Sequence, residues 1–207
     1  MTKFYFLRHG KTVYNQQDRI QGGAVDSPLL PEAIENAEKA GRFLKDVDFD
    51  LAVSSPQKRA LSTAKHAISQ LEKQPPLEID DDLREMGFGD WDGDLVADHI
   101  HDPEMAKIYK DPENYTGDKF NGESYYEVME RGKNYLQTVF ERFPKGNILV
   151  VAHSLTMSSV IGALLGDDFD TMLKRGMVDN TSVSIVETPD FKDFSLKMWN
   201  NTDFLKK

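Results

Sequence analysis

The feature that most constrains the fold is the alternation of short apolar runs with amphipathic helical patterns along the chain. A short apolar run bounded by turn residues predicts a buried strand, and apolar residues three and four positions apart predict a helix. Strands that alternate with helices form mainly parallel sheets. We therefore predict an α/β fold with a mainly parallel central sheet and helices on both faces. The predicted strands cover residues 3–7, 50–54, 77–79, 147–152, 182–187 and 195–199.

Several helix ends can be predicted from capping residues. Ser124 and Glu127 match a capping box at the start of one helix. Ser55 followed by Pro56 predicts an N-cap with proline at the first helical position. A further helix is expected to start at Ser154 and to end at Gly166, because glycine accepts the left-handed conformation of a helix C-terminus.

The length of 207 residues fits one sizeable domain, which we place at 1–207. Residues 90–121 interrupt the alternation with a polar stretch that contains Pro103, Pro112 and Gly117. This stretch predicts an insertion over the C-terminal edge of the sheet that shapes the substrate pocket, since long insertions of this kind often form binding sites. The alternative is a surface excursion without a function.

Charge and composition exclude several classes of partner. The net charge is −10, from 35 acidic and 25 basic side chains, which makes nucleic acid an unfavourable partner. There is no cysteine and hence no disulfide or thiolate metal site. No apolar run approaches the roughly 20 residues that span a bilayer, so we expect no membrane partner. The first residues lack the apolar stretch of a secretory signal, which predicts a cytoplasmic location.

Cationic and imidazole side chains follow three of the predicted strands. Arg8 and His9 end the first strand, Arg59 lies one turn into the helix after the second, and His153 follows the strand at 147–152. The carboxyl ends of parallel strands meet at one edge, where ligands bind. A helical side chain leans toward the helix N-terminus, so Arg59 is expected to point to this edge. Together with a helix N-terminus after His153, these groups predict a site for a dianionic phosphoryl group.

Each of these residues also has a structural interpretation. His9 alone can be a hydrogen-bonded structural histidine, Arg59 alone a solvated residue of a helix face, and His153 a polar end to a strand. Their joint occurrence at three strand ends favours the phosphoryl site.

A carboxyl group completes the predicted chemistry. Glu85 lies in a loop of glycines and aromatic residues, which we expect to hold its carboxyl group against apolar rings. Partial burial keeps a carboxyl group protonated to higher pH, as a general acid requires. The alternative is an ion pair between Glu85 and Arg84.

These motifs, in this order, resemble those of the histidine phosphatase superfamily, whose fold is shared with cofactor-dependent phosphoglycerate mutases. The resemblance covers most of the chain. It rests on Leu7-Arg8-His9-Gly10-Lys11-Thr12 with Asn15, Ile20-Gln21-Gly22, Ser54-Ser55-Pro56 with Arg59, Leu83-Arg84-Glu85 with Phe88-Gly89, Gly122-Glu123-Ser124, Val150-Val151-Ala152-His153 and Asn180-Thr181-Ser182-Val183.

The resemblance implies a role for each matching residue. His9 is expected to be the nucleophile that carries a transient phosphohistidine, and Glu85 the general acid and base. Arg8, Arg59 and His153 are expected to hold the phosphoryl oxygens, with Asn15 nearby. Gln21 and Gly22 fall where family members meet the rest of the substrate. The family uses no metal, and we expect neither a metal nor a cofactor here. His9 must attack as a neutral imidazole, and two neighbouring arginines should lower its pKa.

One position departs from the family pattern, because Ser154 stands where glycine usually follows the second histidine. The residue set predicts a phosphatase that hydrolyses small phosphomonoesters and takes a small phosphorylated metabolite as its partner. The alternative is a cofactor-dependent phosphoglycerate mutase, for which the insertion offers Lys107, Lys110 and Lys119 but no arginine. A third hypothesis is a non-catalytic protein that binds a phosphorylated ligand. The presence of both His9 and Glu85 disfavours it. The sequence predicts neither the physiological substrate nor the oligomeric state.

Overall fold

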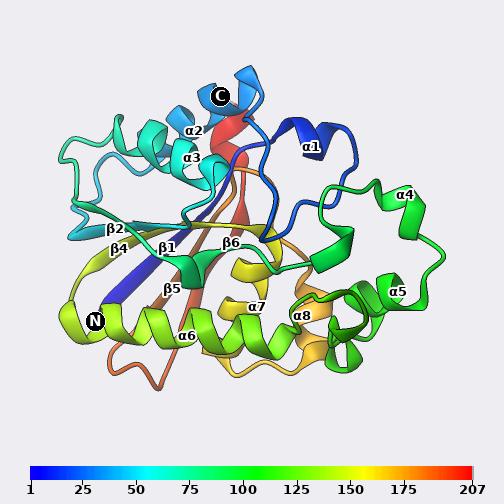
Figure 1. Ribbon diagram of the computed structural model, residues 1–207. Helices are drawn as coiled ribbons and strands as arrows, with labels where there is room; N and C mark the ends of the chain where they lie inside the picture. Colours follow the sequence, from blue (N-terminus) through cyan, green and yellow to red (C-terminus); the bar gives the residue numbers. More distant parts are fainter. Residues whose placement is uncertain (207) are drawn as a thin grey trace.

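The computed structural model describes residues 1–206 and is built around a six-stranded sheet in the order β3-β2-β4-β1-β5-β6 (Figure 1). The first four strands in this order are parallel to their neighbours, whereas β5 is antiparallel to β1 and β6 to β5. The predicted α/β class with a mainly parallel sheet is confirmed. The strands are β1 Thr2–Arg8, β2 Leu51–Ser54, β3 Leu77–Ile79, β4 Asn147–Ala152, β5 Val183–Thr188 and β6 Ser195–Asn201.

Helices cover both faces of the sheet, because side chains of a strand alternate between the faces. Phe4 and Phe6 of β1 join one buried cluster with side chains of α6 and α7, whereas Tyr5 and Leu7 join the opposite cluster with α2 and α3. Figure 1 shows these two layers on opposite sides of the strands. The helices are α1 Val13–Gln16, α2 Pro31–Phe43, α3 Lys58–Ile68, α4 Val96–His99, α5 Pro103–Lys110, α6 Tyr125–Arg142, α7 Ser154–Leu165 and α8 Phe169–Arg175.

Three of the four predicted helix boundaries are confirmed, including the start of α7 at Ser154. Ser124 and Glu127 form the capping box of α6, and Gly166 ends α7 in the left-handed conformation at φ 72°. The remaining prediction is wrong, since α3 begins at Lys58 with Gln57 as its N-cap residue. Ser55 instead remains in the loop after β2, where its hydroxyl meets the imidazole of His153 at 2.8 Å. Ser55 therefore binds a residue of the site and does not cap α3, which begins two residues later than predicted.

Residues 90–121 lie beyond the carboxyl ends of the parallel strands and include α4 and α5 (Figure 1). The segment is polar in composition, yet it carries a third apolar cluster that includes Trp91, Met105, Ile108 and Phe120. The rings of Trp91 and Phe120 stack with centroids 4.0 Å apart. This cluster fixes the insertion against α6 and α7, since Val128 and Leu155 belong to it.

Within residues 1–206, we find no helix that combines the length and the apolar character needed to span a bilayer.

Candidate active site

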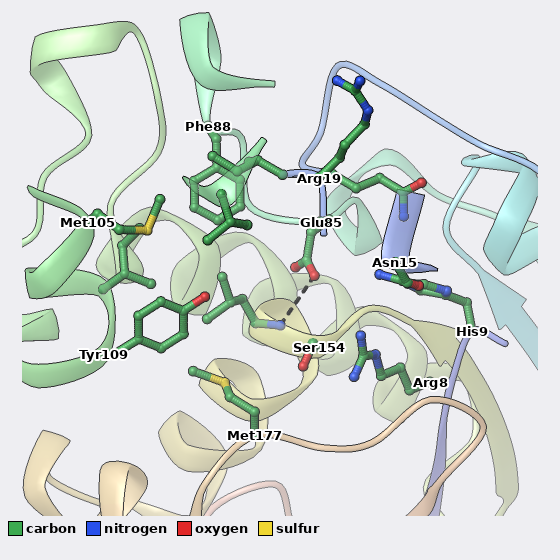
Figure 2. A pocket seen from close by; sticks show the side chains of 15 residues that line it. Arg8, His9, Asn15, Arg19, Glu85, Phe88, Met105, Tyr109, Ser154 and Met177 are labelled. Atoms are coloured by element: carbon green, nitrogen blue, oxygen red, sulfur yellow. Dashed lines mark hydrogen bonds between the residues drawn. The ribbon is translucent and has the colours of Figure 1, made fainter. Parts of the chain in front are cut away.

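A pocket of about 310 Å³ opens at the carboxyl edge of the sheet (Figure 2). It receives polar side chains from the end of β1, from α1 and the loop between α1 and α2, from the Glu85 loop and from the start of α7. The insertion and the segment before β5 complete it. The lining residues are Arg8, His9, Asn15, Arg19, Ile20, Gln21, Glu85, Phe88, Val96, Met105, Ile108, Tyr109, Ser154, Leu155 and Met177.

The backbone at the end of β1 is fixed from both sides. The amide of His9 donates to the carbonyl of Ala152 at 3.0 Å, and the side-chain amide of Asn180 donates to the carbonyl of His9 at 3.1 Å. Gly10 allows α2 to approach closely, because a Cβ at this position would lie 2.9 Å from the Cβ of Ala33. The imidazole of His9 is thus held at the pocket wall with only 2% of the residue exposed.

The hydrogen bonds of His9 define its tautomer. Nδ1 lies 2.8 Å from the carbonyl oxygen of Gly10, which can only accept, so Nδ1 carries the proton. In the neutral ring the lone pair is therefore on Nε2. Burial lowers the pKa of His9 well below its ordinary value, and the charges of Arg59 and Arg8 lower it further. The direction predicted from the two arginines is confirmed, with burial as the larger cause.

His153 lies beside His9, with ring centroids 5.2 Å apart, and is fully buried. The Nε–H of Arg59 donates to its Nδ1 at 3.2 Å, so Nε2 carries the proton and donates to the hydroxyl of Ser55. Burial, and then Arg59, lowers the pKa of His153 well below its ordinary value. Both ring nitrogens are engaged by the protein, and His153 is not among the residues that line the pocket.

Arg59 is likewise behind the pocket wall, with 1% of the residue exposed. Its guanidinium donates to the backbone carbonyls of Gln21, Gly22 and Val25 and forms an ion pair with Asp26 at 3.0 Å. Neither Arg59 nor His153 is among the side chains that line the pocket, and their direct contact with the phosphoryl oxygens stays a prediction. The carbonyls of residues 21–25 close over the guanidinium, because a buried charge needs hydrogen-bond partners. In this arrangement Arg59 positions the pocket loop and His153.

The two buried imidazoles make stability depend on pH. Below pH 6.5 they become protonated in the unfolded chain but stay neutral in the folded protein, so the unfolded state binds more protons and stability falls as the pH falls. Between pH 7.5 and 5.5 we expect the free energy of unfolding to drop by about 1 kcal/mol for each of the two. Urea unfolding at several pH values measures the drop. His9→Asn should flatten the profile and His101→Asn, at an exposed position, should not; equal profiles for all three proteins would contradict this assignment.

Glu85 faces the same pocket from the other side and is 6% exposed. Figure 2 shows its carboxyl group directed into the pocket above Ser154 and Arg8. The sequence predicts that apolar rings surround this carboxyl group. Its main contacts are instead the backbone amides at the N-terminus of α7. The proposed alternative, an ion pair with Arg84, does not form: Arg84 pairs with Asp81 at 2.7 Å.

The two oxygens of Glu85 differ in their partners. Oε1 accepts from the amides of Met86 and Thr156 at 3.0 and 2.9 Å, and the hydroxyl of Thr156 lies 2.9 Å away. Oε2 accepts only a longer bond, 3.3 Å from the amide of Leu155. Because the donors gather at Oε1, Oε2 is the oxygen suited to hold or release a proton toward the pocket.

Thr156 is therefore expected to act as a positioning residue for Glu85. Its hydroxyl lies 2.7 Å from the carbonyl oxygen of Arg84 and 2.9 Å from Oε1 of Glu85, so its single proton is shared between two acceptors of the Glu85 loop and ties this loop to α7. Thr156→Val should lower kcat/KM for alkyl phosphates about tenfold, the value of one such hydrogen bond. Thr156→Ser keeps the hydroxyl and should stay near the parent value. The loss in Thr156→Val should be smaller for nitrophenyl phosphate, and a uniform loss would indicate a structural role only.

The remaining predicted residues divide into two groups. Asn15 and Gln21 line the pocket beside His9, and both contact the hydroxyl of Thr12. Gly22 does not line it; its amide donates to the carboxylate of Asp92 at 2.7 Å. A Cβ at Gly22 would lie 2.5 Å from both Asp92 Oδ1 and the carbonyl oxygen of Met86. Gly22 thus serves close packing of the pocket loop against the Glu85 loop.

Ser154 and several residues not predicted from the sequence also line the pocket. The hydroxyl of Ser154 donates to the carbonyl of Val178 at 3.2 Å, so it has a partner besides any ligand. Met105, Ile108 and Tyr109 come from α5, where the spacing of three and four residues marks one helix face and could have indicated them. Met177 precedes β5 in a segment without periodicity, and no sequence signal points to it.

Within residues 1–206, no group of three or more histidine or carboxylate side chains is arranged to hold a metal ion.

The comparisons with known proteins agree with this geometry. A family model described as "Histidine phosphatase superfamily (branch 1)" matches residues 4–202. The chain belongs to the histidine phosphatase superfamily.

Relatives within this superfamily carry the names of different phosphatases. The adenosylcobalamin/alpha-ribazole phosphatase of Escherichia coli (strain K12) is 31% identical over 178 residues, 82% of each chain. Phosphoserine phosphatase 1 of Hydrogenobacter thermophilus is 28% identical over 96% of this chain and 92% of its own. The structure of YhfR from Bacillus stearothermophilus superposes with a TM-score of 0.90 at 26% identity, over 99% of this chain and all of the other. The predicted class, a phosphoric monoester hydrolase of this superfamily, is confirmed.

Proposed function

We propose that this protein is a metal-independent phosphatase that hydrolyses small phosphomonoesters through a phosphohistidine on His9. The observation that carries the proposal is the arrangement of His9 and Glu85 in one pocket. His9 is held as a neutral ring with its lone pair on Nε2, and the less engaged oxygen of Glu85 is available for proton transfer. A nucleophile and a proton donor in one pocket are what covalent phosphoryl transfer needs.

The first step transfers the phosphoryl group to the protein. Nε2 of His9 attacks phosphorus, the bond to the ester oxygen breaks, and Glu85 donates a proton to the departing oxygen. Arg8 and Asn15 hold the phosphoryl oxygens, because both line the pocket next to His9. Cationic and amide donors of this kind stabilise the charge of the transferring group.

The second step returns the protein to its starting state. Glu85 takes a proton from water, the resulting hydroxide attacks phosphorus, and the bond to Nε2 breaks to release phosphate. Arg59 contributes its charge from behind the wall and keeps His9 neutral, together with burial. His153, fixed between Arg59 and Ser55, supports the ring of His9.

The environment of the insertion lysines favours hydrolysis over the mutase reaction. A phosphoglycerate mutase must bind a second anionic group on the same substrate. Lys107 and Lys119 instead pair with the buried carboxylate of Glu104 at 3.1 and 2.7 Å. Neither they nor Lys110 line the pocket.

Two assays on the purified protein test the proposal. Phosphate release from a panel of phosphorylated metabolites and aryl phosphates should be observed and should be unchanged by chelators. Interconversion of 2- and 3-phosphoglycerate, with and without 2,3-bisphosphoglycerate, should be absent or much slower. Dominant interconversion would identify a mutase, and a chelator-sensitive activity restored by magnesium would contradict the metal-free scheme.

A further inference from the structure

The half of the pocket farther from His9 is apolar. Its side chains come from the loop between α1 and α2, the Glu85 loop, the insertion, the start of α7 and the segment before β5. They are Ile20, Phe88, Val96, Met105, Ile108, Leu155 and Met177. Figure 2 shows Met105 and Met177 on either side of Tyr109, across the pocket from His9. The leaving group of a phosphoester whose phosphorus is at His9 must occupy this half, which we call the leaving-group compartment.

The hydroxyl of Tyr109 points into this compartment (Figure 2). Tyr109 is more than half exposed as a residue, but partial desolvation of its phenol, and then the charge of Glu85, raise its pKa above the ordinary value, so the phenol is neutral near pH 7. A neutral phenol donates one hydrogen bond and accepts another. It can therefore bind one uncharged polar atom of a ligand, and it offers no charge to an anion.

The cationic side chains near the compartment bind other groups of the protein. Arg19 is at the rim, but its guanidinium donates to the carbonyl of Gly93 at 2.7 Å and extends away from Glu85 in Figure 2. Lys107 and Lys119 are held by Glu104. Arg8 belongs to the phosphate end, where it donates to the carbonyl of Val178 at 2.6 Å. Among the lining side chains of residues 1–206, no cation is therefore placed against the far half of the pocket.

We infer that the site selects phosphomonoesters whose leaving group is uncharged and largely apolar or aromatic, and that it disfavours leaving groups with a carboxylate or a second phosphate. This inference rests on the proposed function. An apolar leaving group gains free energy by covering Met105, Ile108 and Leu155. An anionic one loses its hydration without gaining a counter-charge.

A pair of aryl phosphates tests the inference. 2-Naphthyl phosphate and 4-carboxyphenyl phosphate have leaving groups of similar basicity but differ in charge, so the chemical step is comparable for both. We expect kcat/KM to be at least about tenfold higher for the naphthyl ester, because burying an unpaired charge costs more than the roughly 1.4 kcal/mol that a factor of ten represents. Phosphoserine and 3-phosphoglycerate, compared with n-hexyl phosphate, extend the test to alkyl esters.

A positive charge introduced into the compartment should reduce the preference for the uncharged ester. Met177 is partly exposed, so a lysine there can extend its ammonium group along the wall. Met177→Lys should raise kcat/KM for 4-carboxyphenyl phosphate about fivefold relative to Met177→Gln, a neutral control of similar length. The same comparison should show no gain for 2-naphthyl phosphate.

The outcomes separate this inference from the proposed function. Equal kcat/KM for the two aryl esters, or a preference for the anionic one, would overturn the inference and leave the phosphatase proposal intact. A gain for both esters in Met177→Lys would also overturn it, because the effect would not depend on leaving-group charge. Absence of phosphate release from every ester would overturn the proposed function, and the inference with it.

Discussion

Replacing His9 by alanine is expected to lower kcat by at least about 10⁴-fold, because within residues 1–206 His9 is the only histidine that lines the pocket. Of the four ring nitrogens of His9 and His153, Nε2 of His9 is the one without a hydrogen bond to the described part of the chain, so its lone pair is available. Both nitrogens of His153 are engaged, by Arg59 and by Ser55. His153 therefore cannot replace His9 without losing these bonds.

The measurement combines steady-state kinetics with trapping of the intermediate. A reaction with radiolabelled substrate, stopped within its first turnover, should leave label that is acid-labile and base-stable on the peptide that contains His9. His9→Ala should leave none, while His101→Ala, at an exposed position outside the pocket, should behave as the parent. Retention of most activity in His9→Ala, with the fold intact by circular dichroism, would rule the mechanism out.

Glu85→Gln is expected to produce a defect that depends on the leaving group. Alkoxides are poor leaving groups unless they are protonated, whereas nitrophenolate leaves without help. General acid catalysis contributes about 10²–10⁴-fold, so we expect losses of about 10³-fold for alkyl phosphates and no more than about tenfold for nitrophenyl phosphate.

The structure indicates that this variant keeps its geometry. The amide oxygen of glutamine can take the place of Oε1 and accept from the amides of Met86 and Thr156. Its NH₂ group then takes the place of Oε2, where the one contact, to the amide of Leu155, is already long at 3.3 Å. A plot of log kcat/KM against leaving-group pKa should become steeper than in the parent. Equal losses for both classes of ester would exclude Glu85 as the general acid.

Local patterns in the sequence were sufficient for the elements and for part of the site. The continuous apolar run of β1 places Phe4 and Phe6 on one face and Tyr5 and Leu7 on the other, so this strand, which ends at Arg8, follows from the residues themselves. The capping box of α6 and the glycine that ends α7 also depend on contacts within a few residues. Such features can be predicted from the sequence because the residues that stabilise them are close together in the chain.

Other features depend on contacts between distant segments. The start of α3 differs from the prediction, since Ser55 binds His153, nearly a hundred positions away, and does not cap the helix. The insertion, polar in composition, nevertheless packs Trp91 on Phe120, and no local pattern specifies that pairing.

The sequence by itself determined the α/β class, the strand ends that carry Arg8 and His9, and the presence of Glu85 in a glycine-rich loop. Only the tertiary structure decided that Arg59 and His153 are buried and hydrogen-bonded to each other, and that the leaving-group compartment is apolar. The physical reason is that a side chain's chemistry is set by its type, whereas its direction and charge partners are set by whichever distant groups fold against it. Arg59, for example, is buried, and its charge is met by Asp26, by the carbonyls of Gln21, Gly22 and Val25, and by His153, all from distant parts of the chain.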